Sequence, residues 1–215
     1  MIRILIADDH AVVRDGLRRI LQSASGFEVV GEACDSASTI ALVRSTSATV
    51  LVLDLSMPGR NGVELIRQIK EMLPALRILV LTMHAEHQYA VRAFKSGASG
   101  YLTKESAGSE LVAAVNKVAS GGVYVSVSMA ERIAQTFNEP ADALPHQRLS
   151  DREFDVLQRI VAGQTISEIS KELCVSAKTV STYKARILAK MQLPHEAALV
   201  RYAIRHKLFG ENDQV

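Results

Sequence analysis

Short apolar runs alternate with amphipathic segments over the first 121 residues of the chain. Runs typical of buried strands occupy residues 2–7, 27–33, 50–55, 77–82 and 100–103. Between them, apolar residues recur at helical spacing, most clearly over residues 13–21, 65–73 and 111–118. Such strand–helix units predict a doubly wound α/β fold, in which helices cover both faces of a five-stranded parallel sheet.

The pattern changes after residue 121. Residues 122–147 have the composition of an exposed linker and include Pro140 and Pro145, although residues 128–137 could form a short helix. From residue 148 the strand pattern disappears, and apolar residues at helical spacing predict four helices. We therefore expect an α/β domain at 1–121, a linker at 122–147 and a small all-α domain at 148–211.

Polar side chains end four of the predicted strands. Asp8 and Asp9 end the first apolar run, Asp54 ends the third and Thr82 ends the fourth, while Lys104 follows the last. Because the carboxyl ends of parallel strands meet at one edge of a sheet, we expect these groups to share a site. Three carboxylates, a hydroxyl and an ammonium group suit Mg²⁺ and a phosphoryl group.

The chemistry of this expected site follows from its charges. Three crowded carboxylates repel one another, so without a cation at least one of them should have a raised pKa. A carboxylate can also attack phosphorus and form an acyl phosphate. A single Asp at a strand end is more often a helix N-cap, but the joint pattern favours phosphoryl chemistry.

The C-terminal helices carry a second motif. Ser150 and Glu153 form the pattern of a capping box, which predicts a helix start near Asp151. Ser176 has the position of an N-cap after a short turn, so the second and third helices are joined by about four residues, as in a helix-turn-helix. No acidic residue occurs from residue 177 to residue 191. Such a helix can lie in the major groove of DNA, with an ordinary solvated face as the alternative.

The bulk composition adds little. The chain of 215 residues has a formal net charge of +2, and its positive excess lies after residue 148. A membrane span needs about 18 or more consecutive apolar residues, and no such run occurs, nor does a basic segment precede an apolar stretch at the start. We therefore expect a cytoplasmic protein that does not enter the membrane, with Cys34 and Cys174 as free thiols.

Residues 1–121 resemble the receiver domain of a two-component response regulator. The likeness is carried by Asp8-Asp9-His10, by Asp54 with Met57-Pro58-Gly59, by Thr82 and by the segment from Tyr101 to Lys104. It implies that Asp54 is the phosphoacceptor and, with Asp9, a direct magnesium ligand. It further implies that Asp8 acts through a bound water and that the backbone carbonyl of Ser56 is the remaining protein ligand.

The same resemblance assigns the switch residues. Thr82 would move to bind a phosphoryl oxygen, Lys104 would pair with the phosphoryl group, and Tyr101 would turn inward on activation. Many receivers have Pro after this lysine, whereas Glu105 stands here. We interpret His10 and His84 as solvated loop residues rather than ligands.

Residues 149–208 resemble the LuxR-type helix-turn-helix domain of the NarL/FixJ regulators. The residues that carry the likeness are Leu149-Ser150, Arg152-Glu153, Gly163, Glu168-Ile169, Leu173, Ser176 and Thr179-Val180. Many members have Lys and His where Ser181 and Tyr183 stand. The likeness implies base-facing positions at Lys178, Ser181, Thr182 and Ala185, and phosphate contacts from Thr179, Lys184, Arg186 and Lys190. The apolar strip of the last helix, formed by Ala198, Leu199, Tyr202 and Ala203, resembles the family's DNA-bound dimer surface, with packing inside its own domain as the alternative.

Together these resemblances imply a transcriptional regulator controlled by phosphorylation. A sensor histidine kinase would transfer a phosphoryl group to Asp54 with Mg²⁺, and a homodimer would bind paired half-sites in double-stranded DNA. A regulator that needs no phosphate and a protein-interaction module with the same fold are the alternatives. The pocket offers no evident second acid or base, so we expect no catalytic residue and no enzyme such as an aspartyl-phosphate hydrolase.

Overall fold

The structure is a computed structural model that describes residues 1–57, 61–83, 87–137, 144–206 and 208–209. The chain divides into two compact units, Met1–Ala134 and Gln135–Val215. A helix, α6 (Val127–Phe137), forms where the short helix of the linker was predicted.

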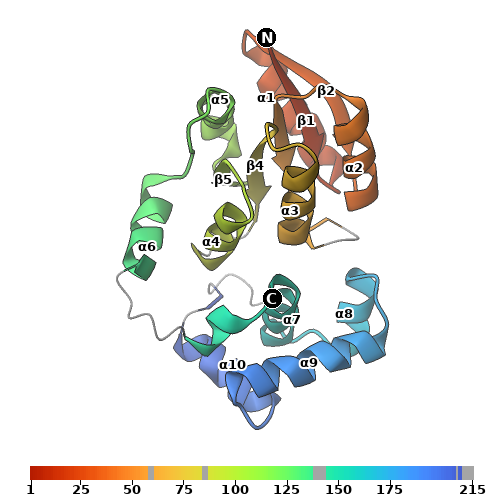
Figure 1. Ribbon diagram of the computed structural model, residues 1–215, viewed down its shortest axis with the longest axis vertical. Coiled ribbons are helices and arrows are strands. Elements are labelled where there is room, and N and C mark those ends of the chain that lie inside the picture. Colours follow the sequence, from red (N-terminus) through yellow and green to blue (C-terminus); the bar gives the residue numbers. More distant parts are fainter. Residues whose placement is uncertain (58–60, 84–86, 138–143, 207, 210–215) are drawn as a thin grey trace. The chain divides into compact units, whose positions relative to one another are not determined.

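The first unit contains the predicted parallel sheet (Figure 1). Its strands are β1 (Ile2–Ala7), β2 (Phe27–Ala33), β3 (Val50–Leu53), β4 (Arg77–Thr82) and β5 (Gly100–Thr103). They lie in the order β2-β1-β3-β4-β5, so the direction of winding reverses between β1 and β3. This reversal is the position where open α/β sheets bind their ligands. Only β3 differs from its predicted bounds, because the chain leaves the strand after Leu53 and turns at Asp54.

Five helices connect and follow the strands: α1 (Ala11–Ser23), α2 (Ser36–Ser45), α3 (Gly62–Met72), α4 (His87–Lys95) and α5 (Ala107–Ala119). The apolar pattern located α1, α3 and α5, whereas α2 and α4 were expected only from the alternation of strands and helices. Helix α2 begins with a capping box, in which the Ser38 N–H donates to Asp35 Oδ1 (2.8 Å). This pair was the available sequence signal for α2.

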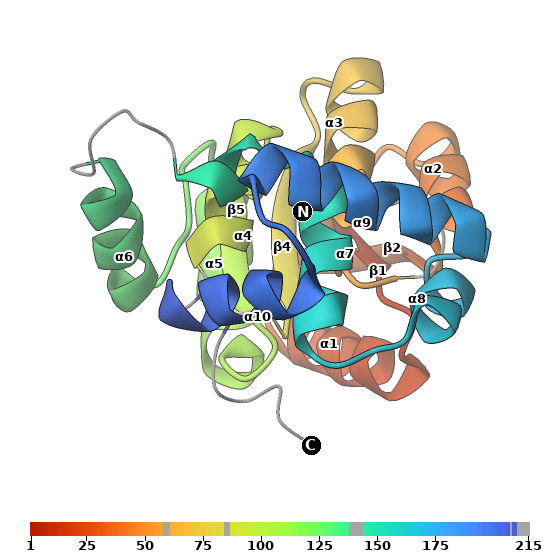
Figure 2. The same ribbon diagram turned by 90° about the horizontal axis from the view of Figure 1, so that it is seen from below.

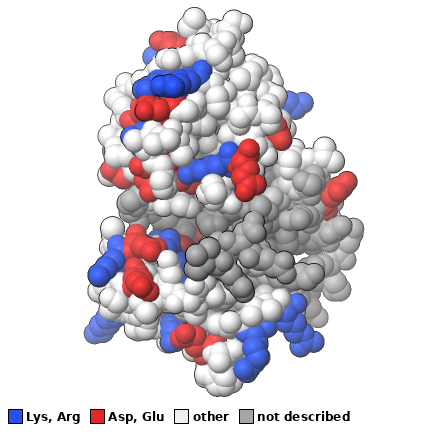
Figure 3. All heavy atoms as spheres, turned by 180° about the vertical axis from the view of Figure 1, so that it is seen from behind, with Lys and Arg blue, Asp and Glu red and all other residues white. Residues whose placement is uncertain are grey.

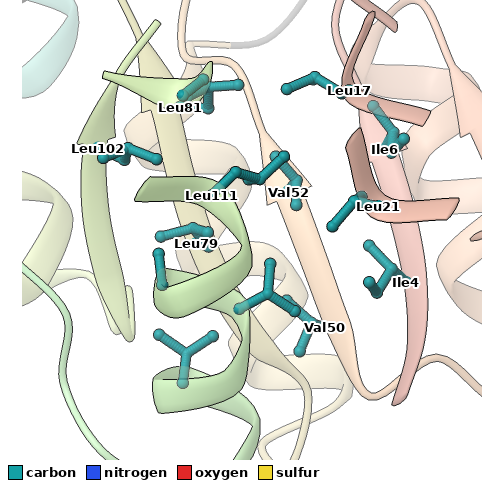
Figure 4. Close-up of a cluster of buried hydrophobic side chains, with 14 residues drawn as sticks. Ile4, Ile6, Leu17, Leu21, Val50, Val52, Leu79, Leu81, Leu102 and Leu111 are labelled. Atoms are coloured by element: carbon teal, nitrogen blue, oxygen red, sulfur yellow. The ribbon is translucent and has the colours of Figure 1, made fainter. Parts of the chain in front are cut away.

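One hydrophobic core lies between the sheet and the layer formed by the two helices α1 and α5. Ile4 and Ile6 of β1 point toward Leu17 and Leu21 of α1, and Leu111 of α5 covers the middle of the sheet (Figure 4). The alternate strand residues, such as Leu5, are equally buried and face the opposite layer. Burial on both faces explains why the strands are continuous apolar runs and why only their ends carry polar groups.

The second unit is all-helical, as predicted. It contains a 3₁₀ turn, η1 (Pro145–Arg148), followed by α7 (Asp151–Val161), α8 (Ile166–Glu172), α9 (Ala177–Met191) and α10 (Glu196–Arg205). Helix α9 packs against both α7 and α8 (Figure 2). The predicted capping box starts α7, and the Ser176 hydroxyl accepts the Thr179 N–H (3.1 Å) at the start of α9. Among the described residues, no helix has the length and apolar character needed to cross a bilayer.

Candidate functional site

Strand register brings two of the predicted carboxylates together. Ala7 of β1 pairs with Leu53 of β3, so the next residues, Asp8 and Asp54, lie side by side at the carboxyl end of the sheet. The Asp54 N–H extends the ladder by donating to the Ala7 carbonyl (2.8 Å). Asp8 and Asp54 are 1% and 2% exposed, respectively. The sheet therefore holds two acidic groups in a nearly solvent-free position.

Lys104 lies between these carboxylates. Its Nζ is 2.7 Å from Asp8 Oδ2 and 2.8 Å from Asp54 Oδ2. Its backbone N–H donates to the Thr82 carbonyl (2.9 Å). This bond continues the β4–β5 pairing and fixes the position of the lysine backbone at the carboxyl end of the sheet. Thr82 itself is buried at the end of β4. The structure thus gathers Asp8, Asp54, Thr82 and Lys104 as the strand ends predicted.

The electrostatics of the pocket follow from its burial. Burial raises the pKa of Asp54, and the hydrogen bond and charge of Lys104 oppose that shift without cancelling it. Burial alone would lower the pKa of Lys104, but its hydrogen bonds and charge interactions with Asp54 and Asp8 outweigh this and raise it. The carboxylates therefore need positive charge nearby, and Lys104 supplies one positive charge for the two carboxylates of Asp8 and Asp54.

The donor atoms also fit a metal ion. One ligand atom from each of Asp8, Asp9, His10 and Asp54 can be chosen so that all lie within 4.8 Å of one another. Asp8 Oδ2 and Asp9 Oδ1 are buried oxygens, and their basic neighbours are Lys104 Nζ and His10 Nδ1, each 2.7 Å away. A cluster of buried carboxylate oxygens suits a hard cation such as Mg²⁺.

The loop after β3 is held close to helix α3. The Ser56 N–H donates to Asp54 Oδ1 (3.1 Å), and Asn61 caps α3 by accepting from the Val63 and Glu64 N–H groups. Gly62 is needed here, because a Cβ at this position would lie 2.5 Å from Leu55 Cα. Pro58, Gly59 and His84, which the sequence singled out, fall outside the described residues.

Tyr101 is already directed into the protein, with 2% of its surface exposed. Its N–H donates to the Tyr124 carbonyl (2.9 Å), so the segment after α5 pairs with β5. After β5, the Ser106 N–H donates to the Thr103 carbonyl (3.1 Å), and this turn leads directly from Lys104 and Glu105 into α5.

Helix α9 presents the face that the sequence predicted. Val180, Ile187 and Met191 are buried, whereas the small outward residues are exposed. Two of these use their hydroxyl protons within the helix: Ser181 donates to the Ala177 carbonyl (3.0 Å) and Thr182 to the Lys178 carbonyl (2.9 Å). The Thr179 hydroxyl is hydrogen-bonded to that of Ser176 (2.8 Å). The exposed candidates Lys178, Ala185 and Arg186 lie on the same helix.

Two basic residues expected to contact phosphates are paired with acidic residues inside the domain. Lys190 Nζ is 2.6 Å from Glu153 Oε2, the carboxylate that also closes the α7 capping box. Lys184 pairs with Glu196 at the start of α10. The sequence analysis found neither pairing. Figure 3 shows that acidic side chains accompany several groups of Lys and Arg on the face it draws.

The apolar strip of α10 is only partly buried inside its own domain. Leu199 and Ala203 are completely or almost completely buried, whereas Ala198 and Tyr202 are partly exposed. Tyr202 of the same helix places its hydroxyl 3.0 Å from Nδ1 of His146, which is buried in η1. This contact was also not anticipated from the sequence.

Comparison with known proteins agrees with both halves of the chain. Residues 4–116 match the family described as "Response regulator receiver domain", and residues 147–203 match "Bacterial regulatory proteins, luxR family". The response regulator UvrY of Escherichia coli K12 is 37% identical over 209 residues, covering 97% of this chain and 96% of UvrY. The response regulator GacA of Pseudomonas protegens is 34% identical over 206 residues, covering 96% and 97%.

Solved structures of response regulators are also similar to this chain. RcsB from Salmonella enterica serovar Typhimurium, bound to the rprA promoter in the presence of phosphomimetic BeF3−, matches with a TM-score of 0.67 and 32% identity. This match covers 94% of the present chain and 97% of RcsB. Given these matches and the acidic pocket at the strand ends, the chain belongs to the response regulators that join a receiver domain to a LuxR-type helix-turn-helix domain.

Proposed function

We propose that Asp54 accepts a phosphoryl group and that this modification controls the binding of helix α9 to DNA. The observation that carries the proposal is the position of Lys104, whose ammonium group lies between the buried carboxylates of Asp8 and Asp54. The charges gathered at the point where the sheet reverses its winding support a role in phosphoryl transfer.

In the proposed reaction, a sensor histidine kinase carries the phosphoryl group on an imidazole nitrogen. An Asp54 carboxylate oxygen attacks phosphorus as the phosphorus–nitrogen bond breaks, and the imidazole leaves with its electron pair and takes up a proton. Asp9, Asp54 and the Ser56 carbonyl would hold Mg²⁺, with Asp8 acting through a water. The ion supplies positive charge to the phosphoryl oxygens.

Lys104 then changes partner. In the structure it pairs with Asp54, and after transfer its Nζ would pair with a phosphoryl oxygen that carries more negative charge. Thr82 would donate its hydroxyl to another oxygen, and Tyr101 would remain packed inward. These local shifts would alter the surface around α4, β5 and α5, which biases dimerisation or frees the DNA-binding helix.

For DNA recognition we propose that α9 lies in the major groove of double-stranded DNA. Lys178, Ser181, Thr182 and Ala185 would face base edges, and Thr179, Lys184, Arg186 and Lys190 would contact phosphates. Because Ser181 and Thr182 donate their protons to helix carbonyls, they would present acceptor lone pairs to the amino groups of adenine or cytosine. The solved complex of the relative RcsB with DNA supports DNA binding by this chain.

The proposal includes a homodimer on paired half-sites and a cytoplasmic protein that acts as a transcriptional regulator rather than a turnover enzyme. We place the functional boundaries at 1–121 for the receiver, 122–147 for the linker and 148–211 for the helix-turn-helix domain. A first test is intact mass after incubation with a small phosphodonor. We expect addition of one phosphoryl group that requires Mg²⁺ and is lost in Asp54→Asn. Modification of Asp54→Asn to the same extent would contradict the assignment.

A further inference from the structure

His10 occupies the N-cap of α1 without capping it. Its side chain makes no hydrogen bond to the first turn of that helix. Instead, its Nδ1 lies 2.7 Å from Asp9 Oδ1 and 3.4 Å from Asp8 Oδ1. The His10 N–H also donates to Asp8 Oδ1 (2.9 Å), which ties the backbone of this residue to the pocket. The sequence-based interpretation of His10 as a solvated loop residue therefore describes only part of its environment.

The spacing of these donor atoms matches a shared ion. Two ligands bound about 2.1 Å from one metal ion in adjacent positions stand about 3 Å apart. The two distances from His10 Nδ1 to Asp9 Oδ1 and Asp8 Oδ1, 2.7 and 3.4 Å, lie on either side of this value. Asp54 belongs to the same group, because one ligand atom from each of Asp8, Asp9, His10 and Asp54 lies within 4.8 Å of the others. His10 is also 65% exposed, so solvent and ions can reach the ring from outside the pocket.

We propose that this pocket also binds a divalent transition-metal ion of borderline softness, such as Zn²⁺ or Cu²⁺, with His10 Nδ1 as a nitrogen ligand beside Asp9 and Asp54. The inference rests on the proposed magnesium site. Imidazole nitrogen suits Zn²⁺ and Cu²⁺, whereas Mg²⁺ prefers oxygen, so His10 strengthens binding of the softer ions without helping Mg²⁺. Such ions would compete with Mg²⁺ for Asp54 and thereby reduce its availability as a nucleophile.

The expected preference of the site for Zn²⁺ and Cu²⁺ over Mg²⁺ follows from its ligand atoms. All divalent first-row ions gain from the charges of Asp9 and Asp54, so the carboxylates alone discriminate weakly between them. Intrinsic affinities rise toward Cu²⁺ in any mixed nitrogen and oxygen site. Loss of the nitrogen ligand should therefore weaken Zn²⁺ and Cu²⁺ binding by at least about tenfold and leave Mg²⁺ binding unchanged. A loss of about tenfold is already typical when a residue that only orients a metal ligand is replaced.

The test uses the full chain without a phosphodonor and compares the wild type with His10→Asn and His195→Asn. Asn is a favourable N-cap, so both variants keep their helix starts, and His195, the N-cap of α10, is the matched control. Calorimetry would give the affinities for Zn²⁺ and Mg²⁺, and electron paramagnetic resonance at substoichiometric Cu²⁺ would report nitrogen coupling. We expect His10→Asn alone to lose Zn²⁺ affinity and the nitrogen signal.

Unchanged Zn²⁺ affinity in His10→Asn, or an equal loss in His195→Asn, would overturn the proposal. An equal loss of Mg²⁺ and Zn²⁺ affinity in His10→Asn would also overturn it, since His10 would then act only through the shape of the pocket. If no protein in the set bound Mg²⁺, the proposed magnesium site itself would be wrong. Asp9→Asn should weaken binding of both ions, which locates them in this pocket.

Discussion

Lys104 Nζ lies 2.8 Å from Asp54 Oδ2, so the proposed phosphoacceptor is paired with an internal cation. Removal of that cation leaves two carboxylates buried together, which is costly. We expect Lys104→Met to lower the free energy of unfolding by about 1–3 kcal/mol in Mg²⁺-free buffer, less than the roughly 3–5 kcal/mol of a fully buried pair, because the ammonium is partly solvated. Chemical denaturation would measure this change.

The matched control is the exposed Lys95, whose replacement by Met should change stability by less than about 0.5 kcal/mol. Adding Asp54→Asn to Lys104→Met should restore part of the loss, because one buried charge is removed. Equal stability of Lys104→Met and Lys95→Met would show that the pocket does not depend on this ammonium group.

The pair between Glu153 and Lys190 predicts a pH dependence in the second unit. Burial alone would raise the pKa of Glu153, but its hydrogen bonds with Lys190 and Ser150 outweigh burial and lower it. A carboxyl group with a lowered pKa in the folded state stabilises the fold above its unfolded pKa, near 4.5, and this contribution is lost as the pH falls through the folded pKa.

We therefore expect Glu153→Gln, which keeps the capping geometry, to be less stable than the wild type at neutral pH. The difference should shrink as the pH falls below about 4.5. Thermal unfolding of both proteins across this range checks the sign. A difference that stays constant with pH would mean that the charge of Glu153 contributes nothing.

The pairing of Lys184 with Glu196 predicts unequal roles for two basic residues of α9. Arg186 is exposed, whereas Lys184 must leave Glu196 before it binds a phosphate. We expect Arg186→Gln to weaken binding to all DNA sequences about equally and to reduce the slope of log affinity against log salt by about 1. Lys184→Gln should reduce the slope by less, and Glu196→Gln should strengthen binding.

Fluorescence anisotropy over a salt series would measure these slopes, with Glu172→Gln as a control because Glu172 pairs with Arg159 of α7. Loss of discrimination between sequences, with unchanged non-specific affinity, would contradict the phosphate assignment of Arg186. Weaker binding by Glu196→Gln would show that Glu196 positions Lys184 for DNA rather than competing with it.

Two glycines of the first unit predict opposite effects of the same substitution. A Cβ at Gly62 would lie 2.5 Å from Leu55 Cα, so Gly62→Ala must displace the loop that follows Asp54. A Cβ at Gly16, inside α1, would meet no atom within 4 Å. We expect Gly62→Ala to destabilise the protein and slow phosphorylation of Asp54, and Gly16→Ala to stabilise it by about 0.5–1 kcal/mol.

Denaturation and phosphorylation rates measured on both variants test this contrast. Wild-type behaviour of Gly62→Ala would mean that the loop has room to move, contrary to its close packing on α3.

The strands and the pocket could be predicted because they depend on local patterns. Fully buried strands are short apolar runs, and parallel topology alone brings their ends, such as Asp54 and Lys104, to one edge. Helix α2 was not located by the apolar pattern because its apolar residues form no clear stripe, although Asp35 and Ser38 mark its start. The amphipathic pattern predicted the buried face of α9 correctly.

The ion pairs of the second unit could not be predicted in this way. Glu153 and Lys190 are 37 residues apart and meet only because α7 packs against α9. The role of Leu199 depends equally on tertiary packing, since an apolar strip looks the same whether it faces its own domain or a second copy. The contacts of the His10 ring with Asp8 and Asp9 could not be predicted for a related reason, because the sequence does not show the direction of an exposed side chain.

The central claim is that a phosphoryl group on Asp54 governs how tightly α9 binds DNA. The most direct measurement compares phosphorylated and unphosphorylated protein, with Asp54→Asn treated in the same way, on a panel of promoter fragments at one salt concentration. We expect phosphorylation to tighten binding to at least one fragment by about tenfold or more, and treatment of Asp54→Asn to have no effect. Equal affinity of the two forms for every fragment would contradict the account.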